Sequence, residues 1–176
     1  MAADTPVATQ NALPPLTGSS RQVLLQKFYL RDASVEAPLA PQIFSRPWQP
    51  QVDVNVATNV QALGEDQFHL TLTVTVTAKL GNDVAFLIEV QQAGVFIVRD
   101  FPEEAERAAV LAGYCPSLLF PFAREAISDF VQKAGFPQLL LQPINFEALY
   151  LEHLNRARSA AAAGEAAGPA ATDATH

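Results

Sequence analysis

The chain has 176 residues, of which 49% are hydrophobic and 16% charged, and its formal net charge at pH 7 is −7. This length fits a single domain with terminal extensions. The negative charge argues against a nucleic-acid partner, because nothing here would neutralise a row of phosphates. The single cysteine, Cys115, excludes an internal disulfide and a multi-cysteine zinc site, and it favours a reducing compartment.

The two ends of the chain differ in composition from the rest. Residues 1–20 are rich in Pro, Ala, Thr and Ser and lack the basic and apolar regions of a signal peptide, so they predict a disordered arm. Residues 159–176 are rich in Ala and Gly and predict a tail, although their alanines can extend a helix to about Gly164. No apolar run approaches the roughly 20 residues that a membrane helix needs. We therefore expect a cytoplasmic protein without membrane insertion, whose folded domain covers residues 21–158.

The first predicted strand lies within residues 23–35, and its mixed pattern indicates that both faces are partly covered. The loop that follows has four prolines within 13 residues, which argues against both helix and sheet pairing and predicts a stiff surface loop. Trp48 either plugs the core at the base of this loop or forms the wall of a groove for an apolar ligand. The large apolar residues of the loop are Ile43, Phe44 and Trp48.

Alternation of apolar and polar residues predicts three more strands. Residues 52–60 carry their valines on one face, and from Phe68 to Leu80 every even position is apolar and every odd position is polar. Residues 84–98 keep apolar side chains at most even positions. A three-residue loop, residues 81–83, would pair Leu80 with Val84 and place both apolar sets on one face. The hairpin then has one buried face and one open polar face, which suits binding better than catalysis.

Three helices are predicted after the strands. A short helix begins at Pro102, with an acidic first turn, and ends near Gly113. Pro121 opens a second helix that stops at Gly135, and Asn145 caps a third. Four strands followed by helices indicate an α+β fold: one four-stranded antiparallel sheet with helices packed on one face.

The second predicted helix is apolar around most of its circumference. A single sheet face in so small a domain cannot cover such a helix, so the pattern predicts an oligomer interface. The residues assigned to this interface are Phe122, Ile127 and Phe130.

Few residues suit catalysis. No histidine pair has metal-ligand spacing, and Cys115 has no histidine nearby in sequence. His69 falls on the polar face of a strand, and His153 sits beside Glu152 on a helix, where adjacent side chains diverge by about 100°. We therefore expect no enzyme, no catalytic residue, no cofactor and no metal.

Six segments of the chain together carry a resemblance to a known family. In chain order they are FYLRDASVEAP, APQIFSRPWQP, VTVTA, FLIEVQQAGVF, AGYCPSLLFPFAREAISD and GFPQLLLQPINFEALY. This ordered set resembles the SecB family of protein-export chaperones. The resemblance runs from about residue 23 to residue 155, and the chain departs from it where LAGYCP stands in place of the more typical LGAYCP.

The resemblance implies a SecB-like fold and a cytoplasmic homotetramer, built as a dimer of dimers, without a cofactor. Such a chaperone holds unfolded precursor polypeptides in an export-competent state and delivers them to the SecA motor. The client groove would be lined by Phe44, Trp48 and Tyr150, with Leu154 as a supporting contact. SecA would dock on the open sheet face, at Asp32, Glu36, Leu87 and Glu89.

Three other readings stay open at this point. A chaperone of the same fold can serve a toxin–antitoxin system with one dedicated client. A plain apolar-ligand carrier would use the same groove for a small molecule. An enzyme with an apolar pocket would need a convergent set of polar residues, which the sequence does not offer.

Overall fold

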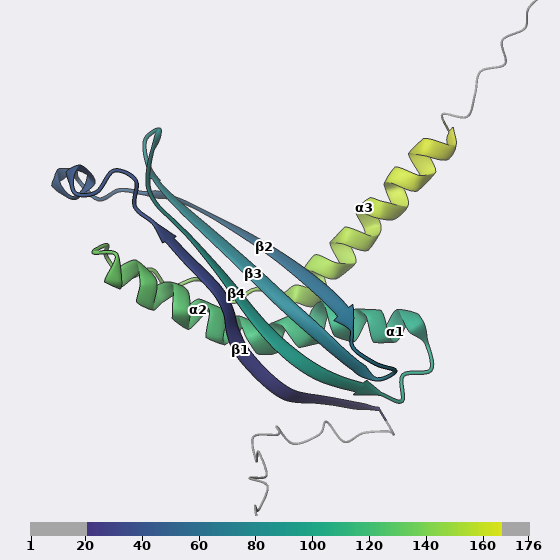
Figure 1. The fold of residues 1–176 in the computed structure, drawn as a ribbon. Coiled ribbons are helices and arrows are strands. Elements are labelled where there is room, and N and C mark those ends of the chain that lie inside the picture. Colours follow the sequence, from purple (N-terminus) through teal and green to yellow (C-terminus); the bar gives the residue numbers. More distant parts are fainter. Residues whose placement is uncertain (1–20, 167–176) are drawn as a thin grey trace, which may run out of the picture.

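The computed structural model describes residues 21–166 and places a four-stranded antiparallel sheet in front of its helices (Figure 1). The predicted α+β fold is confirmed. The strand order is β1-β4-β3-β2, so the central pair is the long hairpin seen in the sequence. The strands are β1 (Gln22–Glu36), β2 (Gln51–Ala62), β3 (Gln67–Leu80) and β4 (Asp83–Arg99).

The β3–β4 hairpin differs from its prediction at the turn. Leu80 pairs with Asp83, so the turn consists of two residues, Gly81 and Asn82, and not of three. Gly81 has φ +65°, a left-handed conformation that favours glycine. A bulge beside Ala78 then shifts the register by one residue, so that even positions pair with even positions further along. The loop length was wrong, but both apolar sets do share one face.

Strand β1 shows why its sequence pattern is mixed. Its register against β4 shifts twice, between Leu25 and Lys27 and between Leu30 and Asp32. Each bulge reverses which side chains face the helices, because side chains alternate along a strand. A single alternating pattern therefore does not predict which residues of β1 face the helices.

The predicted first and second helices form one continuous helical run. It consists of α1 (Glu104–Ala109), a π-helical turn η2 (Val110–Tyr114) and α2 (Cys115–Lys133). Pro121 lies inside α2 and not at its start, so the predicted helix boundaries near Gly113 and Pro121 are wrong. The wide π turn accommodates Gly113, whose carbonyl oxygen accepts a hydrogen bond of 2.7 Å from the hydroxyl of Ser117.

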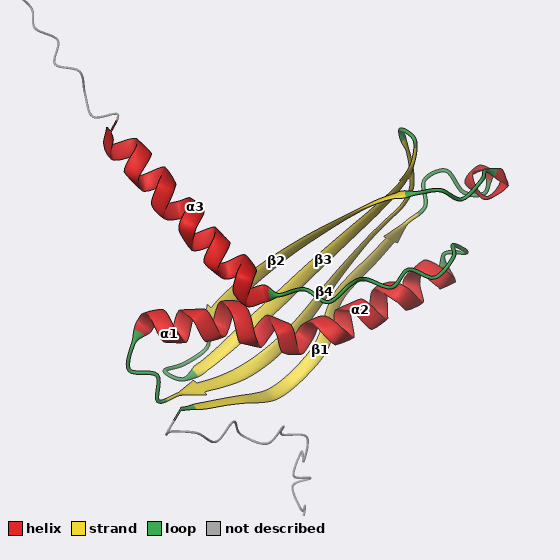
Figure 2. Ribbon diagram, turned by 180° about the vertical axis from the view of Figure 1, so that it is seen from behind, coloured by secondary structure: helices red, strands yellow, loops and turns green. Residues whose placement is uncertain are grey.

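Helix α2 is covered on two sides, which explains its apolar circumference. One side packs against β4 and β3, and the chain after α2 runs back along the helix (Figure 2). This returning segment buries Phe136, Leu141 and Phe146, and the rings of Phe120 and Phe146 lie 5.6 Å apart. The sequence analysis assigned the apolar surface that the sheet leaves uncovered to an oligomer interface, whereas the returning chain covers part of it.

The proline-rich loop contains a short helix, η1 (Gln42–Ser45), where none was predicted. The amide of Ile43 donates to the Leu39 carbonyl at 2.9 Å, and the amide of Phe44 donates to the Pro41 carbonyl at 3.1 Å. Proline disfavours a helix because it has no N–H to donate. The donors of this short turn are Ile43 and Phe44, so the prolines around it do not prevent it from forming. The turn places Ile43 in the core.

The last helix, α3 (Phe146–Ala166), leaves the body of the molecule (Figures 1 and 2). Asn145 caps it as predicted, since its side-chain oxygen accepts a hydrogen bond of 3.0 Å from the amide of Ala148. The helix packs mainly on η2. No helix in the described part of the chain is long and apolar enough to cross a membrane. The predicted N-terminal arm and the last residues of the tail lie outside the described residues.

Candidate functional site

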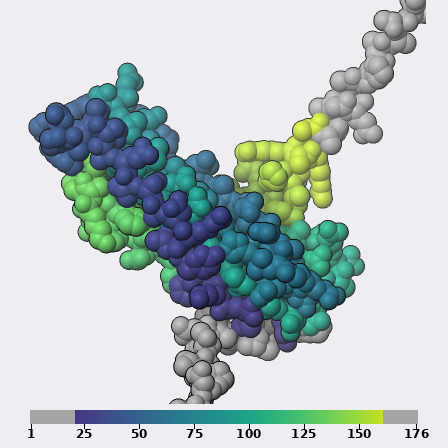
Figure 3. All heavy atoms as spheres, viewed as in Figure 1, coloured from purple at the N-terminus to yellow at the C-terminus, as the bar shows by residue number. Residues whose placement is uncertain are grey.

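The two faces of the sheet differ as the sequence predicted. The even positions of β3 and β4 face the helices and form the core, while the odd positions form an open face. Figure 3 looks onto this open face, where the strands make a continuous surface and α3 stands to one side. The open face carries threonines of β3, together with polar and charged residues of β1 and β4.

Four residues assigned to SecA docking lie next to one another on the open face. The second bulge of β1 puts Asp32 opposite Gln91, and four residues later Glu36 lies opposite Leu87. The carboxylate of Glu89 accepts hydrogen bonds of 3.2 Å from the Thr75 hydroxyl and the Gln91 amide. Asp32 and Glu36 are exposed, and Leu87 and Glu89 are half-buried. Three carboxylates thus surround one apolar side chain, Leu87. We call Asp32, Glu36, Leu87 and Glu89 the acidic patch.

Phe44 and Trp48 belong to an aromatic cluster at the end of the sheet where the proline-rich loop lies. The ring of Trp48 lies 5.2 Å from that of Phe136 and 6.4 Å from that of Phe86. The ring of Phe44 lies 5.1 Å from that of Phe136 but remains 48% exposed. Trp48 is therefore partly buried against the core at the base of the loop, and Phe44 is the more exposed of the two rings.

Tyr150 and Leu154 lie on α3 and form no part of this aromatic cluster. Tyr150 lines a cavity of about 620 Å³ between α3, η2 and β2, whose wall includes Val56 and Ala112. Glu152, His153 and Arg156 also line this cavity. Within the described chain, the predicted groove residues thus form two separate groups.

Strand β2 connects the two groups. The side of β2 that faces the helices is apolar, because Val52, Val54 and Val56 pair with Ala78, Val76 and Val74, which are buried on that face. Helix α2 packs on β4 and β3, and Val54 is left 43% exposed. These valines run from the loop towards the cavity beside Tyr150. We call Phe44, Val52, Val54, Val56 and Tyr150 the apolar band.

Sequence reasoning missed the exposure of the β2 valines. Its valines were seen as one face of a strand, which usually means a face buried in the core. Their exposure depends on where α2 lies across the sheet, and alternation within one strand does not report that.

The three residues assigned to the oligomer interface differ in burial. Ile127 is fully buried against the sheet within one chain, so it belongs to the core and its assignment to an oligomer interface is corrected. Phe122 is 40% exposed and stacks on Phe28 of β1, with ring centroids 4.2 Å apart. Phe130 is half-buried against the core.

Two features of the described residues bear on whether the chain could supply a nucleophile or bind a metal ion. Burial raises the pKa of the Cys115 thiol to about 12, so it stays protonated near neutral pH and is a poor nucleophile. Burial and the neighbouring Cys115 also raise the pKa of Tyr114. No group of three or more potential metal ligands occurs among residues 21–166.

Comparison with known proteins decides the family. The family model described as preprotein translocase subunit SecB matches residues 17–157. The chain belongs to the SecB family. The protein-export protein SecB of Thioalkalivibrio sulfidiphilus is 52% identical over 148 residues, which cover 83% of this chain and 86% of that protein. SecB of Halorhodospira halophila is 52% identical over 140 residues, which cover 80% of each chain. The chain is a SecB chaperone of protein export, as its sequence indicated.

A solved structure supports the fold. A SecB-like chaperone of Mycobacterium tuberculosis, in complex with a peptide from an antitoxin, aligns with a TM-score of 0.55 at 17% identity. The alignment covers 69% of this chain and 90% of that one. At this identity the likeness shows the SecB-like fold.

Proposed function

We propose that this SecB-family chain captures unfolded precursor polypeptides along the apolar band and delivers them to SecA in the cytoplasm. The observation that supports this most directly is the uncovered apolar side of β2, which links the exposed ring of Phe44 to the cavity beside Tyr150. A monomeric protein rarely leaves a contiguous apolar strip exposed without a partner. An extended client is a suitable partner, because β2 is an edge strand that offers backbone groups as well as side chains.

Capture of this kind is weak at each contact and strong along the chain. One apolar side chain buried on the band contributes about 2 kcal/mol. A client with several apolar segments binds further sites at high effective concentration, so affinity multiplies with client length. Folded proteins hide such segments and should not bind.

A substitution in the middle of the band tests this assignment. Val54→Asp places a charge on the apolar side of β2, and Asn55→Asp places the same charge on the other side of the same strand. Suppression of precursor aggregation should weaken about tenfold in Val54→Asp and stay at the wild-type level in Asn55→Asp. Equal behaviour of the two variants would move the client site elsewhere.

The acidic patch is the proposed SecA site. Its carboxylates suit a basic segment, and Leu87 supplies an apolar contact between them. Exposed charge pairs contribute about 0–1 kcal/mol each, so binding depends on several charges and falls with salt. Glu89→Lys with Asp32→Lys should reduce SecA affinity at low salt and leave client capture intact. Glu65→Lys, in the β2–β3 loop, is a control that makes the same charge change as either single substitution, Glu89→Lys or Asp32→Lys. SecA binding unaffected by the double variant would rule out this patch.

The proposed assembly is a homotetramer. It is supported by exposed apolar side chains on the helix side of β1 and on α2, namely Phe28, Leu30 and Phe122, which are 40–47% exposed. Phe122→Asp should yield smaller species in light scattering. A wild-type chain that is monomeric at micromolar concentration would contradict the proposal.

A further inference from the structure

The proline-rich loop, residues 37–50, is attached to the body by apolar contacts at its middle and end. Ile43 lies in the core, and Phe44 and Trp48 contact Phe136, which follows α2. The ring of Phe44 also packs close to Gly135, whose φ is +88°. A Cβ added at Gly135 would lie 3.3 Å from the Phe44 ring. These contacts hold one side of the loop against the segment that follows α2. The other side of the loop contacts the β3–β4 turn.

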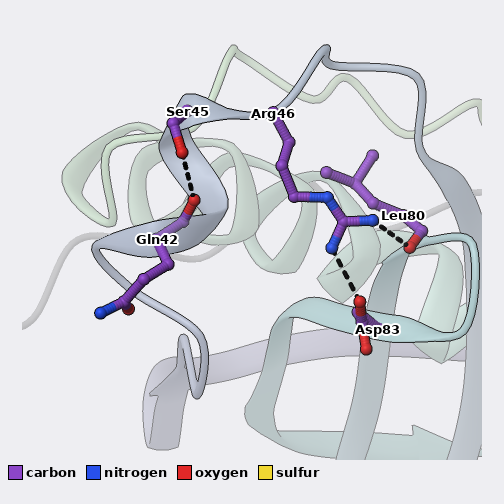
Figure 4. Close-up of polar contacts among 5 residues, drawn as sticks. All are labelled: Gln42, Ser45, Arg46, Leu80 and Asp83. Carbon is purple, nitrogen blue, oxygen red and sulfur yellow. Dashed lines mark hydrogen bonds and ion pairs between the residues drawn. The ribbon is translucent and has the colours of Figure 1, made fainter.

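Arg46 provides that second attachment, between the two aromatic residues in sequence. Its guanidinium donates to the carboxylate of Asp83 at 2.7 Å and to the carbonyl oxygen of Leu80 at 3.0 Å (Figure 4). Both acceptors lie at the β3–β4 turn, 34 and 37 residues away in sequence. The planar fork of arginine can make both bonds at once, which lysine cannot do with the same geometry.

Hydrogen bonds fix the turn immediately before Arg46, which contains Phe44. The amide of Arg46 donates to the Ile43 carbonyl at 3.2 Å and closes η1. The hydroxyl of Ser45 donates to the Gln42 carbonyl at 2.8 Å within the same turn (Figure 4). A shift of Arg46 therefore carries the exposed ring of Phe44 with it.

We propose that Arg46 and Asp83 form a latch that positions the proline-rich loop for client capture. Arg46 is thus a positioning residue, and the proposal rests on the proposed client site at the apolar band. The side chains of Arg46 and Asp83 are 42% and 54% exposed, so salt reaches and screens the pair. The latch makes the loop end of the client site sensitive to ionic strength, although the client contacts there are apolar.

Trp48 provides a direct readout, because it is the single tryptophan of the chain and lies in the same loop. Arg46→Gln and Asp83→Asn each remove the ion pair. Acrylamide quenching of Trp48 at low salt should rise in both variants. Affinity for a reduced, carboxymethylated polypeptide that cannot refold should fall about two- to fivefold. Raising the salt to roughly 1 M should bring the wild type to the level of Arg46→Gln, and should change Arg46→Gln little.

Charge reversal separates a latch from a general structural role. Arg46→Glu with Asp83→Arg restores an ion pair with reversed polarity but not the hydrogen bond to the Leu80 carbonyl, because a glutamate side chain has no N–H to donate. The double variant should therefore recover part of the lost affinity and protection. Arg99→Gln is the matched control, because Arg99 and Asp66 form a comparable pair, at 3.0 Å, at the other end of the hairpin. That variant should match the wild type in both assays.

The outcomes distinguish the latch from the function on which it rests. If the single variants match the wild type in quenching and affinity, or if charge reversal recovers neither, the latch is refuted. If the wild type binds no unfolded polypeptide, the proposed function fails, and Trp48 quenching still shows whether Arg46 holds the loop.

Discussion

Cys115 is an ionisable group that the chain keeps inside an apolar core, at the first residue of α2. Cys115 is fully buried within the core, and burial alone accounts for the rise of its pKa from 9.0 to about 12. The sequence analysis could exclude a disulfide here. It could not foresee how deeply the thiol is buried, because that depends on the packing of β4 over α2.

The buried thiol should make the protein less stable in alkali. Above pH 9 the unfolded chain releases the thiol proton and the folded chain retains it, so the free energy of unfolding falls by up to about 1.4 kcal/mol per pH unit until about pH 12. Urea denaturation from pH 8 to pH 11 measures this slope. Cys115→Ala should show a shallower slope. Parallel curves for the two proteins would mean that the thiol is not protected.

Ile127 and Phe122 lie on the same helix and should respond differently to truncation. Ile127 is fully buried within one chain, so Ile127→Ala should cost about 2–5 kcal/mol of stability and leave the assembly's mass unchanged. Phe122→Ala should cost less stability and weaken association. Denaturant midpoints and light scattering measure the two effects, and a reversed pattern would return Ile127 to the interface.

At the scale of elements, alternation in the β3–β4 hairpin and the Asn145 cap were predicted correctly, and local irregularities were not. The period of two predicted β3 and β4, and Asn145 predicted the start of α3. The bulges of β1, the π turn of η2 and the proline inside α2 escaped prediction, because each is a local irregularity that tertiary packing sustains. The acidic patch was assigned from family resemblance, and the β1 bulges supply the geometry that brings its members together.

The site where α3 meets the body depends on one glycine. A Cβ at Gly113 would lie 2.9 Å from Cγ and 3.3 Å from Cα of Glu147, in the first turn of α3. The departure from the usual motif, with Ala112 before Gly113, therefore puts the residue without a side chain where α3 approaches. Ala112 in turn lines the cavity beside Tyr150.

Gly113→Ala should loosen α3. The added methyl group forces Glu147 outward, and hydrogen exchange should quicken at the start of α3 while the β3–β4 core stays protected. Gly64→Ala is the matched control, because a Cβ there meets no atom within 4 Å. If hydrogen exchange in α3 is the same in the two variants, the close contact between Gly113 and Glu147 does not hold α3 against the body.

At the scale of the whole molecule, the sheet separates the two proposed sites. The acidic patch lies on the open face of β1 and β4, and the valines of the apolar band lie on the opposite face of the sheet, on the edge strand β2. The proposed client and SecA sites therefore occupy different surfaces of the chain. Strand alternation sets the two faces, since neighbouring residues of one strand point to opposite faces of the sheet.

Site-specific photo-crosslinking tests this separation most directly. A photoreactive side chain is introduced at Val52, at its neighbour Asp53 on the opposite face of β2, and at Leu87 in the acidic patch. With an unfolded precursor the account predicts crosslinks from Val52 and none above background from Asp53 or Leu87. With SecA it predicts crosslinks from Leu87 and none from Val52. A precursor that crosslinks equally from Val52 and Asp53, or only from Leu87, would contradict the assignment of the client to the apolar band.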